Sequence, residues 1–206
     1  MPPGPKQTKG ERTAARIMDV AEDLFARHGY EGTSLRNIAE GANIKEPGLY
    51  NHFSGKQGLY EAVLFRALSP MADAMNEQLS QASGLRDYTD LPSVMLDMLL
   101  EHPQMASLFQ QALQGDPNSL GNRLVQGWLD GLFEQGMQSM EHLGASGEAD
   151  WESMALNVIA MFNLVTGYVL SQRVFESLAG GDIKNPDNVA RQKRLLHRVI
   201  RAMLIS

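Results

Sequence analysis

The sequence predicts an all-α protein, and three observations support this class. Apolar residues recur at helical spacing from Glu11 onward. No run of alternating apolar and polar residues exceeds four, and β-branched residues are sparse. The 206 residues are 43% hydrophobic and 20% charged, a balance that excludes wholesale disorder and allows one or two domains around a sizeable core.

The first thirty residues divide into an arm and a helix. Residues 1–10 contain three prolines and two glycines, and we expect them to form a flexible arm. An apolar face that runs from Ala14 to Phe25 predicts the first helix. Gly29 is expected to end this helix because glycine readily adopts the left-handed backbone found after a helix.

A second and a third helix follow, joined by a tight turn. Thr33 is expected to cap the second helix, and residues 41–43 form the turn because Gly and Asn tolerate left-handed backbone. The third helix is expected over 46–53, with Pro47 in its first turn. This spacing has the layout of a helix-turn-helix. A third helix of roughly 12 Å suits a groove about 12 Å wide better than a core position.

The rest of the chain is also predicted to be helical. The linkers contain Gly, Ser, Asp or Pro, and Pro70 is expected to bend or break the helix that contains it. We expect helices over 56–82, 91–101, 103–114, 119–143, 150–178 and 186–204.

Composition excludes several kinds of site and compartment. The chain has no cysteine, so disulfides, thiolate metal sites and cysteine nucleophiles are excluded. The first residues contain no apolar segment typical of a signal peptide. The longest apolar stretch, Val158 to Leu170, is shorter than a membrane-spanning helix and contains two polar residues. We therefore expect a cytoplasmic protein.

Charge is distributed unevenly along the chain. The net charge is -6, yet residues 1–60 carry eight Lys/Arg against seven Asp/Glu, while residues 61–206 carry ten against seventeen. An acidic body with a basic N-terminal end indicates an anionic partner at that end. A solubilising tail explains the charge alone equally well.

One contiguous signature resembles a known family. The run from Thr33 to Phe53, followed by Lys56-Gln-Gly-Leu-Tyr60, closely resembles the DNA-binding domain of tetracycline-repressor-type (TetR) regulators. The resemblance covers about residues 11–65 and includes Phe25-Ala-Arg-His-Gly29-Tyr30, Ile38-Ala39 and Leu49-Tyr50-Asn51-His52-Phe53. Beyond this region only length and helical character are similar. Asn43-Ile44-Lys45 stands where the family commonly has Gly, Val or Ile, and Ser, which affects the DNA sequence recognised rather than the class.

The resemblance implies a domain order and a function. It implies a flexible basic arm at 1–10, a helix-turn-helix DNA-binding domain at 11–58, and a helical effector-binding and dimerisation domain at 59–206. The expected function is that of a DNA-binding transcriptional regulator, an effector-responsive repressor that binds a palindromic operator in double-stranded DNA as a homodimer. A regulator of the same family that activates, or that answers to a protein partner, is the alternative within the class.

The resemblance also implies which residues contact DNA. The third helix would enter the major groove, and other side chains would meet the phosphate backbone or a base. The candidates are Thr33, Arg36, Lys45, Glu46, Pro47, Leu49, Tyr50, His52 and Lys56. Structural explanations stay open: Thr33 as a cap only, Tyr50 packed on Phe53, and Glu46 as a solvated charge.

The C-terminal helices are expected to form the dimer. Helix 150–178 is apolar nearly all round, which predicts cover on every side, and small residues on it permit close helix contact. A two-fold dimer would double the DNA contacts and predict a palindromic site. The dimer candidates are Ala160, Leu164, Gly167, Ser171, Leu196, Val199 and Met203. Core packing within one protomer is the alternative explanation.

The body is expected to hold a small, mostly apolar effector. The chain contains 12 methionines, and methionine adapts to varied apolar ligands, although it also fills irregular cores. Asn163 lies within an apolar helix and would orient a polar group of the ligand or bridge helices. The ligand-binding candidates are Met71, Met75, Met98, Phe109, Leu113, Trp128, Phe133, Met137, Phe162 and Asn163.

Two functions from other classes were compared with this one. An enzyme is disfavoured because the five histidines are scattered and the chain has no H-E-x-x-H, Gly-x-Ser-x-Gly or phosphate-binding glycine loop. We expect no cofactor and no metal. A helical small-molecule carrier without DNA binding is disfavoured by the basic arm and the helix-turn-helix signature. Salt dependence separates the carrier from the DNA-binding regulator, since only DNA binding should weaken steeply as salt rises.

Overall fold

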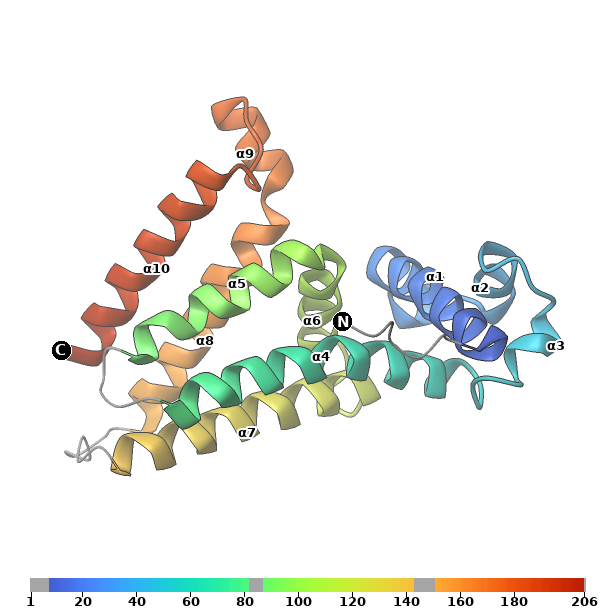
Figure 1. The fold of residues 1–206 in the computed structure, drawn as a ribbon, viewed down its shortest axis with the longest axis horizontal. Helices are drawn as coiled ribbons and strands as arrows, with labels where there is room; N and C mark the ends of the chain where they lie inside the picture. The colour runs from blue at the N-terminus through green and yellow to red at the C-terminus, as the bar shows by residue number, and fades with distance from the viewer. Residues whose placement is uncertain (1–7, 82–86, 143–150, 206) are drawn as a thin grey trace, which may run out of the picture.

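The computed structural model describes residues 8–81, 87–142 and 151–205, and within these residues every secondary-structure element is a helix. Figure 1 shows an elongated molecule with two parts. We call α1 to α3 the head and α5 to α10 the body; α4 runs from one into the other. The all-α prediction is confirmed for the part of the chain that the structure describes.

The head begins with a well-capped helix. The helix α1 spans Lys9–Gly32, and Thr8 and Glu11 form a capping box at its start, with the Thr8 side chain accepting from the Glu11 N–H. The predicted arm therefore ends at Thr8, and residues 1–7 lie outside the described residues. Gly29 was expected to end this helix; with φ of 72° and ψ of 174° it interrupts α1, which continues to Gly32.

Thr33 does not cap the second helix, which corrects the expectation. The helix α2 spans Leu35–Gly41, and Ser34 is its cap, accepting from the Asn37 N–H at 3.1 Å. The Thr33 hydroxyl instead donates to the backbone oxygens of Leu24 and Gly29. The break at Gly29 leaves carbonyls near the end of α1 without helical partners, and the buried Thr33 satisfies them.

The third helix is shorter than predicted. The helix α3 spans Glu46–Leu49, followed by turns where a helix to Phe53 was expected. The N–H groups of His52 and Phe53 both donate to the Leu49 oxygen, at 3.0 and 3.1 Å, which closes the helix. The turn before α3 follows the prediction, since Asn43 has a φ of 51°.

Most helices of the body begin and end close to the predicted residues. Pro70 lies inside α4, which continues through it as one helix. The predicted helix 150–178 is two helices because the chain breaks at Ser171, whose hydroxyl donates to the Gly167 oxygen at 2.6 Å. The elements are α4 (Lys56–Gln81), the 3-10 helix η1 (Asp87–Asp90), α5 (Leu91–Glu101), α6 (Pro103–Gln114), α7 (Leu120–His142), α8 (Trp151–Leu170), α9 (Gln172–Ala179) and α10 (Pro186–Ile205).

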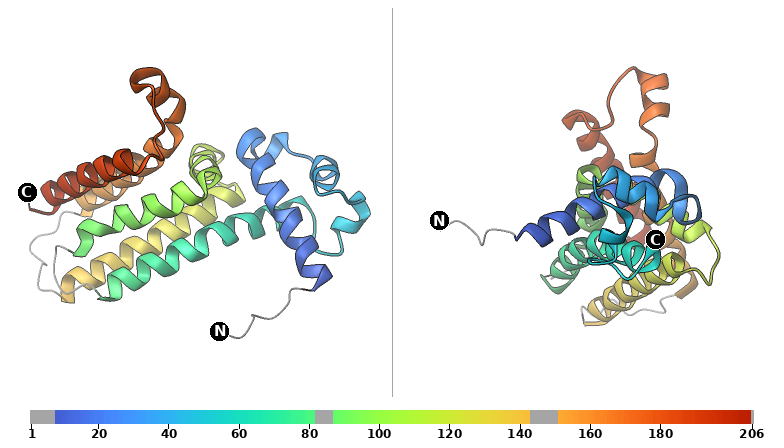
Figure 2. Two further views of the ribbon diagram at one scale, coloured as in Figure 1. Left: turned by 45° about the horizontal axis from the view of Figure 1, so that its top comes forward. Right: turned by 90° about the vertical axis from the view of Figure 1, so that its right-hand side faces the viewer.

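One hydrophobic core runs from the head into the body along α4. In the head, Phe25 and Tyr30 of α1 meet Tyr60 of α4, with ring centroids 4.9 to 6.0 Å apart. Farther along, Leu64 and Met71 of α4 are fully buried in the same core. The views in Figure 2 show α4 and α7 side by side along the body.

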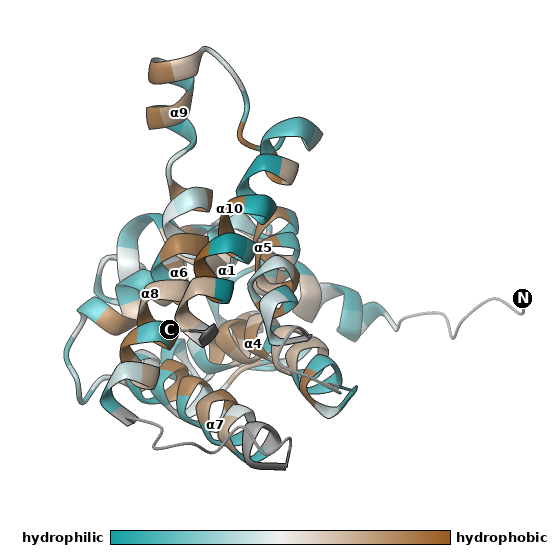
Figure 3. Ribbon diagram, turned by 90° about the vertical axis from the view of Figure 1, so that its left-hand side faces the viewer, coloured by the Kyte–Doolittle hydropathy of each residue, from teal (hydrophilic) through white to brown (hydrophobic). Residues whose placement is uncertain are grey.

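The helices α8 and α9 are poorly covered within this chain. The segment Glu152–Leu170 is long and apolar enough by length and composition to cross a membrane, contrary to the shorter stretch judged from sequence, and 22% of it is buried. It still packs as a body helix, because Val165 and Thr166 are fully buried. The helix α9 has no buried residue and projects from the body with apolar residues on its surface (Figure 3).

Candidate nucleic-acid interface and ligand cavity

The short helix α3 lies at the end of the molecule farthest from the C-terminus (Figures 1 and 2). Leu49 is fully buried and holds α3 against the core of the head. Lys45, which precedes α3, and Glu46 and Pro47 in its first turn are exposed. Lys45 occupies the cap position without a capping side-chain hydrogen bond. Its ammonium and the Glu46 carboxylate face solvent at the tip of the head.

Two predicted contact residues are displaced by the fold. Leu49 was expected to face a groove, but it is fully buried because the short α3 has one apolar side chain to pack against the core. Thr33 was expected to meet a phosphate, but it is 3% exposed and its hydroxyl already serves two backbone oxygens. Neither side chain is available to a nucleic acid without unfolding the head.

The other predicted contact residues lie on the surface of the head. Tyr50 is 56% exposed directly after α3, and His52 is half-buried beside Phe53. Lys56 begins α4, where its ammonium lies 4.4 Å from the centre of the Tyr30 ring and donates to the backbone oxygen of Glu31. These positions allow the hydroxyl, the imidazole and the ammonium to reach an anionic partner.

Arg36 lies on the exposed side of α2 and is paired. Its Nε donates to a carboxylate oxygen of Glu40 at 2.9 Å, and this hydrogen bond raises the pKa of the guanidinium. Both side chains are largely exposed, so this i,i+4 pair is weak and can open when a phosphate competes for the arginine.

Two positions at α3, the half-buried Gly48 and the exposed Asn51, were not among the predicted contacts. A side-chain carbon added to Gly48 would meet no atom within 4 Å, so the backbone of α3 is open to close approach there. Asn51 is exposed beside Tyr50. The available sequence signal was a glycine within a short amphipathic helix, which usually indicates a close neighbour.

A cavity of about 280 Å³ lies within the body. The structure brings five of the predicted ligand-binding residues into its wall, namely Met75, Trp128, Phe133, Met137 and Phe162. The predicted set left out further wall residues from α4, η1, α5, α7, α8 and α10, because their contribution depends on how distant helices meet. These are Leu79, Tyr88, Leu91, Met95, Leu129, Leu132, Gly136, Met154, Asn157, Val158, Met161, Ile200 and Met203.

The other five predicted ligand residues lie outside the wall. Met71 and Phe109 are fully buried in the core, and Phe109 stacks on Trp128 at 5.8 Å between ring centroids. Met98 and Leu113 are half-buried against the core. Asn163 is exposed; its amide nitrogen donates to the Ile159 oxygen and its oxygen accepts from Gln110. Helix rotation places its amide away from the cavity.

The predicted dimer residues divide between surface and interior. Leu196 is fully buried and Met203 lines the cavity, because the face of α10 that bears them packs inward. Ala160, Leu164, Gly167, Ser171 and Val199 are half-buried. Leu156 and Ile159 on α8 and Leu170 at its end are 65%, 56% and 46% exposed. Leu156, Ile159 and Leu170 thus form an apolar stripe that this chain leaves uncovered, and the stripe lies next to the face of α8 predicted for the dimer.

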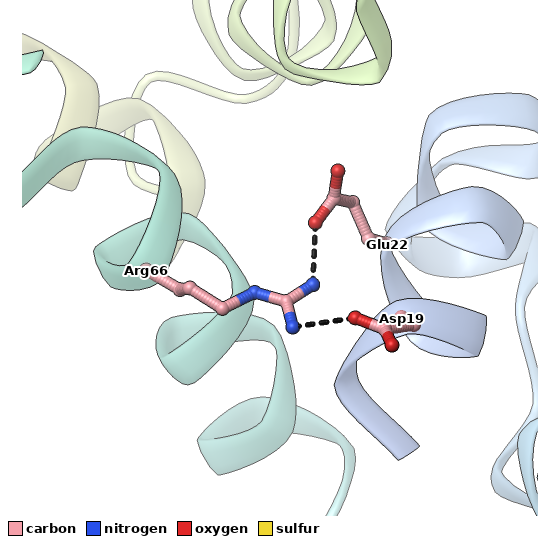
Figure 4. Close-up of polar contacts among 3 residues, drawn as sticks. All are labelled: Asp19, Glu22 and Arg66. Atoms are coloured by element: carbon pink, nitrogen blue, oxygen red, sulfur yellow. Dashed lines mark hydrogen bonds and ion pairs between the residues drawn. The ribbon is translucent and has the colours of Figure 1, made fainter. Parts of the chain in front are cut away.

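An ion-pair clamp, formed by Arg66, Asp19 and Glu22, joins α4 to α1 of the head. Arg66 of α4 donates to Asp19 at 2.7 Å and to Glu22 at 2.6 Å, both on α1 (Figure 4). Burial opposes the charge on Arg66, but its hydrogen bonds to the Glu22 and Asp19 carboxylates outweigh this effect and raise the pKa of the guanidinium. Met75 and Leu79 of the same helix line the cavity. One helix therefore contacts both the cavity and α1.

No cluster of three or more His, Asp or Glu side chains that could hold a metal occurs among the residues that the structure describes. The wall of the cavity contains no charged side chain among those residues. The arrangement suits binding of a partner at the tip of the head and of an apolar molecule in the body.

The head matches a known family. Residues 17–63 match the family of bacterial regulatory proteins, tetR family. The chain is 42% identical over 83 residues to the HTH-type transcriptional repressor ComR of Escherichia coli, covering 38% of this chain and 39% of that protein. It is 29% identical over 153 residues to the HTH-type transcriptional regulator RutR of Escherichia coli O157:H7, covering 63% and 70%. The chain spans about two fifths to half of the length of the first curated relatives it matches.

Solved structures share the whole fold. The fatty acid degradation regulator FadR of Bacillus halodurans aligns with a TM-score of 0.72 at 19% identity, covering 98% of both chains. The transcriptional regulator FadR of Bacillus subtilis, solved in complex with stearoyl-CoA, aligns with a TM-score of 0.67 at 16% identity, covering 93% of this chain and 97% of that chain. At these identities the likeness concerns the fold alone. In the head, this chain is thus similar in sequence to the tetR family of bacterial regulatory proteins, and its whole fold is similar to that of solved regulators.

Proposed function

We propose that this protein is a DNA-binding transcriptional regulator, an effector-responsive repressor that binds a palindromic operator as a homodimer. The observation that carries the proposal is a tetR-type head whose α3 is held by the buried Leu49 while Lys45, Glu46 and Pro47 face outward at the tip. A regulator of this kind acts in the cytoplasm and needs no catalytic group.

The exposed residues of the head define the proposed DNA contacts. Lys45 would donate to guanine or phosphate, Glu46 would accept from cytosine, and Pro47 would touch a thymine methyl group. Phosphate contacts would come from Arg36, Tyr50, His52 and Lys56. Thr33 and Leu49 are left out because both are buried.

The uncovered stripe on α8 supports the dimer. Leu156, Ile159 and Leu170 expose large apolar side chains, and Leu195 of α10 is also 38% exposed. A second copy that packs on this stripe would remove it from water and bring two heads to one duplex. Val199 and Gly167, both half-buried, would lie at the margin of such an interface.

The cavity supports a small apolar effector, and α4 supplies a route to the head. The fold neighbour from Bacillus subtilis was solved with stearoyl-CoA, which supports accommodation of an apolar chain by a helical body of this shape. An effector in contact with Met75 and Leu79 would shift α4, and Arg66 would carry the shift to α1. A hundredfold loss of operator affinity requires a coupling free energy of about 3 kcal/mol.

Selection of duplexes from a random pool, followed by fluorescence anisotropy over a salt series, tests the DNA part. We expect a palindromic site and an affinity that falls steeply as salt rises. Lys45→Ala should weaken binding and reduce the salt slope by about one if the ammonium meets a phosphate. Lys184→Ala, on an exposed loop of the body, is the matched control and should bind like the parent.

A carrier without DNA binding would select no duplex and would show no salt dependence, which would refute the proposal. In vitro transcription from the selected site separates repression, the expected result, from activation.

A further inference from the structure

The wall of the cavity carries no charge. None of its residues is Asp, Glu, Lys, Arg or His in the part of the chain that the structure describes. A charged ligand group in this cavity would lose its hydration and find no opposite charge to replace it. The cavity of about 280 Å³ lies near the lower end of the range for ligand sites, roughly 300–1,000 Å³. It therefore favours a small, uncharged molecule.

Two polar groups belonging to the wall residues lack a partner. The Tyr88 hydroxyl and the Trp128 indole N–H are shielded from solvent and form no hydrogen bond with any described residue. Tyr88 is 6% exposed, and both residues line the cavity, one from η1 and one from α7. Buried polar groups are nearly always hydrogen-bonded. Two unused donors at one apolar cavity are the feature that a ligand with an acceptor atom would satisfy.

A third polar side chain belongs to the same wall. Asn157 of α8 lines the cavity and is half-buried, and its amide offers a donor and an acceptor without a charge. The remaining wall residues are aliphatic, aromatic, methionine or glycine. The polar groups of the wall are thus few and neutral, the pattern that fixes the orientation of an apolar ligand.

We propose that the cavity binds an uncharged, largely apolar molecule that carries a hydrogen-bond acceptor, such as a ketone, ester or lactone carbonyl, and that Tyr88 and Trp128 donate to this acceptor. The inference rests on the effector role proposed above and adds the chemical class of the ligand. It separates this cavity from a site for a free carboxylate or for a phosphate-bearing headgroup.

A group of basic side chains of the body lines a different groove. Arg191, Arg194 and Arg198 of α10 line it at the start of α5, together with Lys193, His197, Ser93 and Asp90, and this groove shares no lining residue with the cavity. Lys193 is already paired with Asp97 at 2.6 Å. An anionic amphiphile would have to use this groove for its head, which gives the test a distinct outcome.

Isothermal titration calorimetry on the full-length protein tests the class of ligand. We would compare 2-decanone, decanoate, decylamine and decanoyl-CoA, with 1-decene as the hydrocarbon that lacks an acceptor. We expect 2-decanone to bind at least tenfold more tightly than decanoate or decylamine. Operator affinity of the ligand-free protein is measured separately, so that failure of the ligand class and failure of the DNA function are distinguishable.

Two conservative variants test the donors. Tyr88→Phe and Trp128→Phe should each weaken 2-decanone binding about tenfold while leaving 1-decene binding nearly unchanged. Because the Tyr88 hydroxyl has no partner among the described residues, the ligand-free Tyr88→Phe protein should melt at the same or a higher temperature. Tyr168→Phe is the matched control: its hydroxyl donates to the Ile183 oxygen at 2.6 Å outside the cavity, so stability should fall without loss of ligand affinity.

Three results would overturn the inference. The first is that decanoate or decanoyl-CoA binds as tightly as 2-decanone. If the double variant Arg194→Gln/Arg198→Gln then loses that binding, the ligand is an anionic amphiphile. The second is an unchanged 2-decanone affinity in both donor variants. The third is no measurable binding of 2-decanone or 1-decene. Retained operator binding in any of these cases would leave the DNA function standing.

Discussion

The head and the body satisfy their apolar surface differently. In the head, Leu49, Phe25 and Ile38 are fully buried, and the side chains left at the tip are mainly polar. The body leaves apolar surface in three places: in the wall of the cavity, on the outer stripe of α8, and on α9, where Val174 and Leu178 are exposed. A region that packs completely can present one fixed surface to a partner. A region with uncovered apolar surface gains stability from what it binds.

The largest expected effect tests whether Leu49 belongs to the packing of the head or to its outer surface. Leu49→Ala removes a fully buried side chain and should lower the free energy of unfolding by about 2 to 5 kcal/mol. Urea unfolding followed by circular dichroism measures this change. Glu46→Ala, exposed in the same helix, should leave it nearly unchanged. A stable Leu49→Ala protein with lost operator affinity would return Leu49 to the contact surface.

The stripe on α8 is the corresponding test in the body. Ile159→Asp places a charge where the proposed dimer buries an apolar side chain, and should raise the dimer dissociation constant roughly thirty- to a hundredfold, or about 2 to 3 kcal/mol. Light scattering after size-exclusion chromatography measures the mass. Phe65→Asp adds the same charge at an exposed residue of α4 and should stay dimeric. An Ile159→Asp dimer would mean that another surface pairs the chains.

Arg66 joins α4 to α1 of the head, and its removal should loosen α1. Arg66→Ala should lower the free energy of unfolding by about 1 to 3 kcal/mol, since two hydrogen bonds to charged groups are lost. Glu22→Gln should cost more than Asp19→Asn, because the Glu22 side chain is 14% exposed and that of Asp19 is 69% exposed. Amide hydrogen exchange of α1 reports the loosening. Equal effects of the two carboxylate variants would contradict this reading of the clamp.

Tyr60 is expected to give the smallest change in the free energy of unfolding, and only at high pH. Burial raises the pKa of Tyr60, with a smaller contribution from Tyr30. An unfolded tyrosine releases its proton near pH 10. Above that pH the folded protein holds a proton that the unfolded chain has lost, so the free energy of unfolding falls with rising pH, by about 1.4 kcal/mol for each pH unit up to the folded pKa. Below about pH 10 both states hold the proton, so the free energy of unfolding does not change with pH through Tyr60.

Urea unfolding at pH 8, 10 and 11 measures this dependence. Tyr60→Phe should reduce the fall, whereas Tyr50→Phe, at an exposed tyrosine of the head, should leave it as in the parent. An identical fall in Tyr60→Phe would assign the titration to another group.

Some turns, breaks and caps were predictable from the sequence and others were not, and the reason lies in the residues at each position. The turn at Asn43 and the break at Gly29 were predictable because each depends on the backbone preference of one residue. The break at Ser171 was missed because apolar residues continue from α8 into α9 and neither glycine nor proline occurs at residues 168–176. Thr33 and Ser34 are both good caps, and only the position of the kinked end of α1 decides between them.

The sequence by itself determined the helical class, the limits of most helices from α4 onward and the family signature of the head, because these depend on periodicity and on residues close together in the chain. Only the tertiary structure decided that Leu49 and Thr33 are buried, that Asn163 lies outside the cavity and that Tyr88 and Ile200 belong to its wall. Those outcomes depend on the rotation and crossing of helices distant in the chain, which are set by packing the whole core at once.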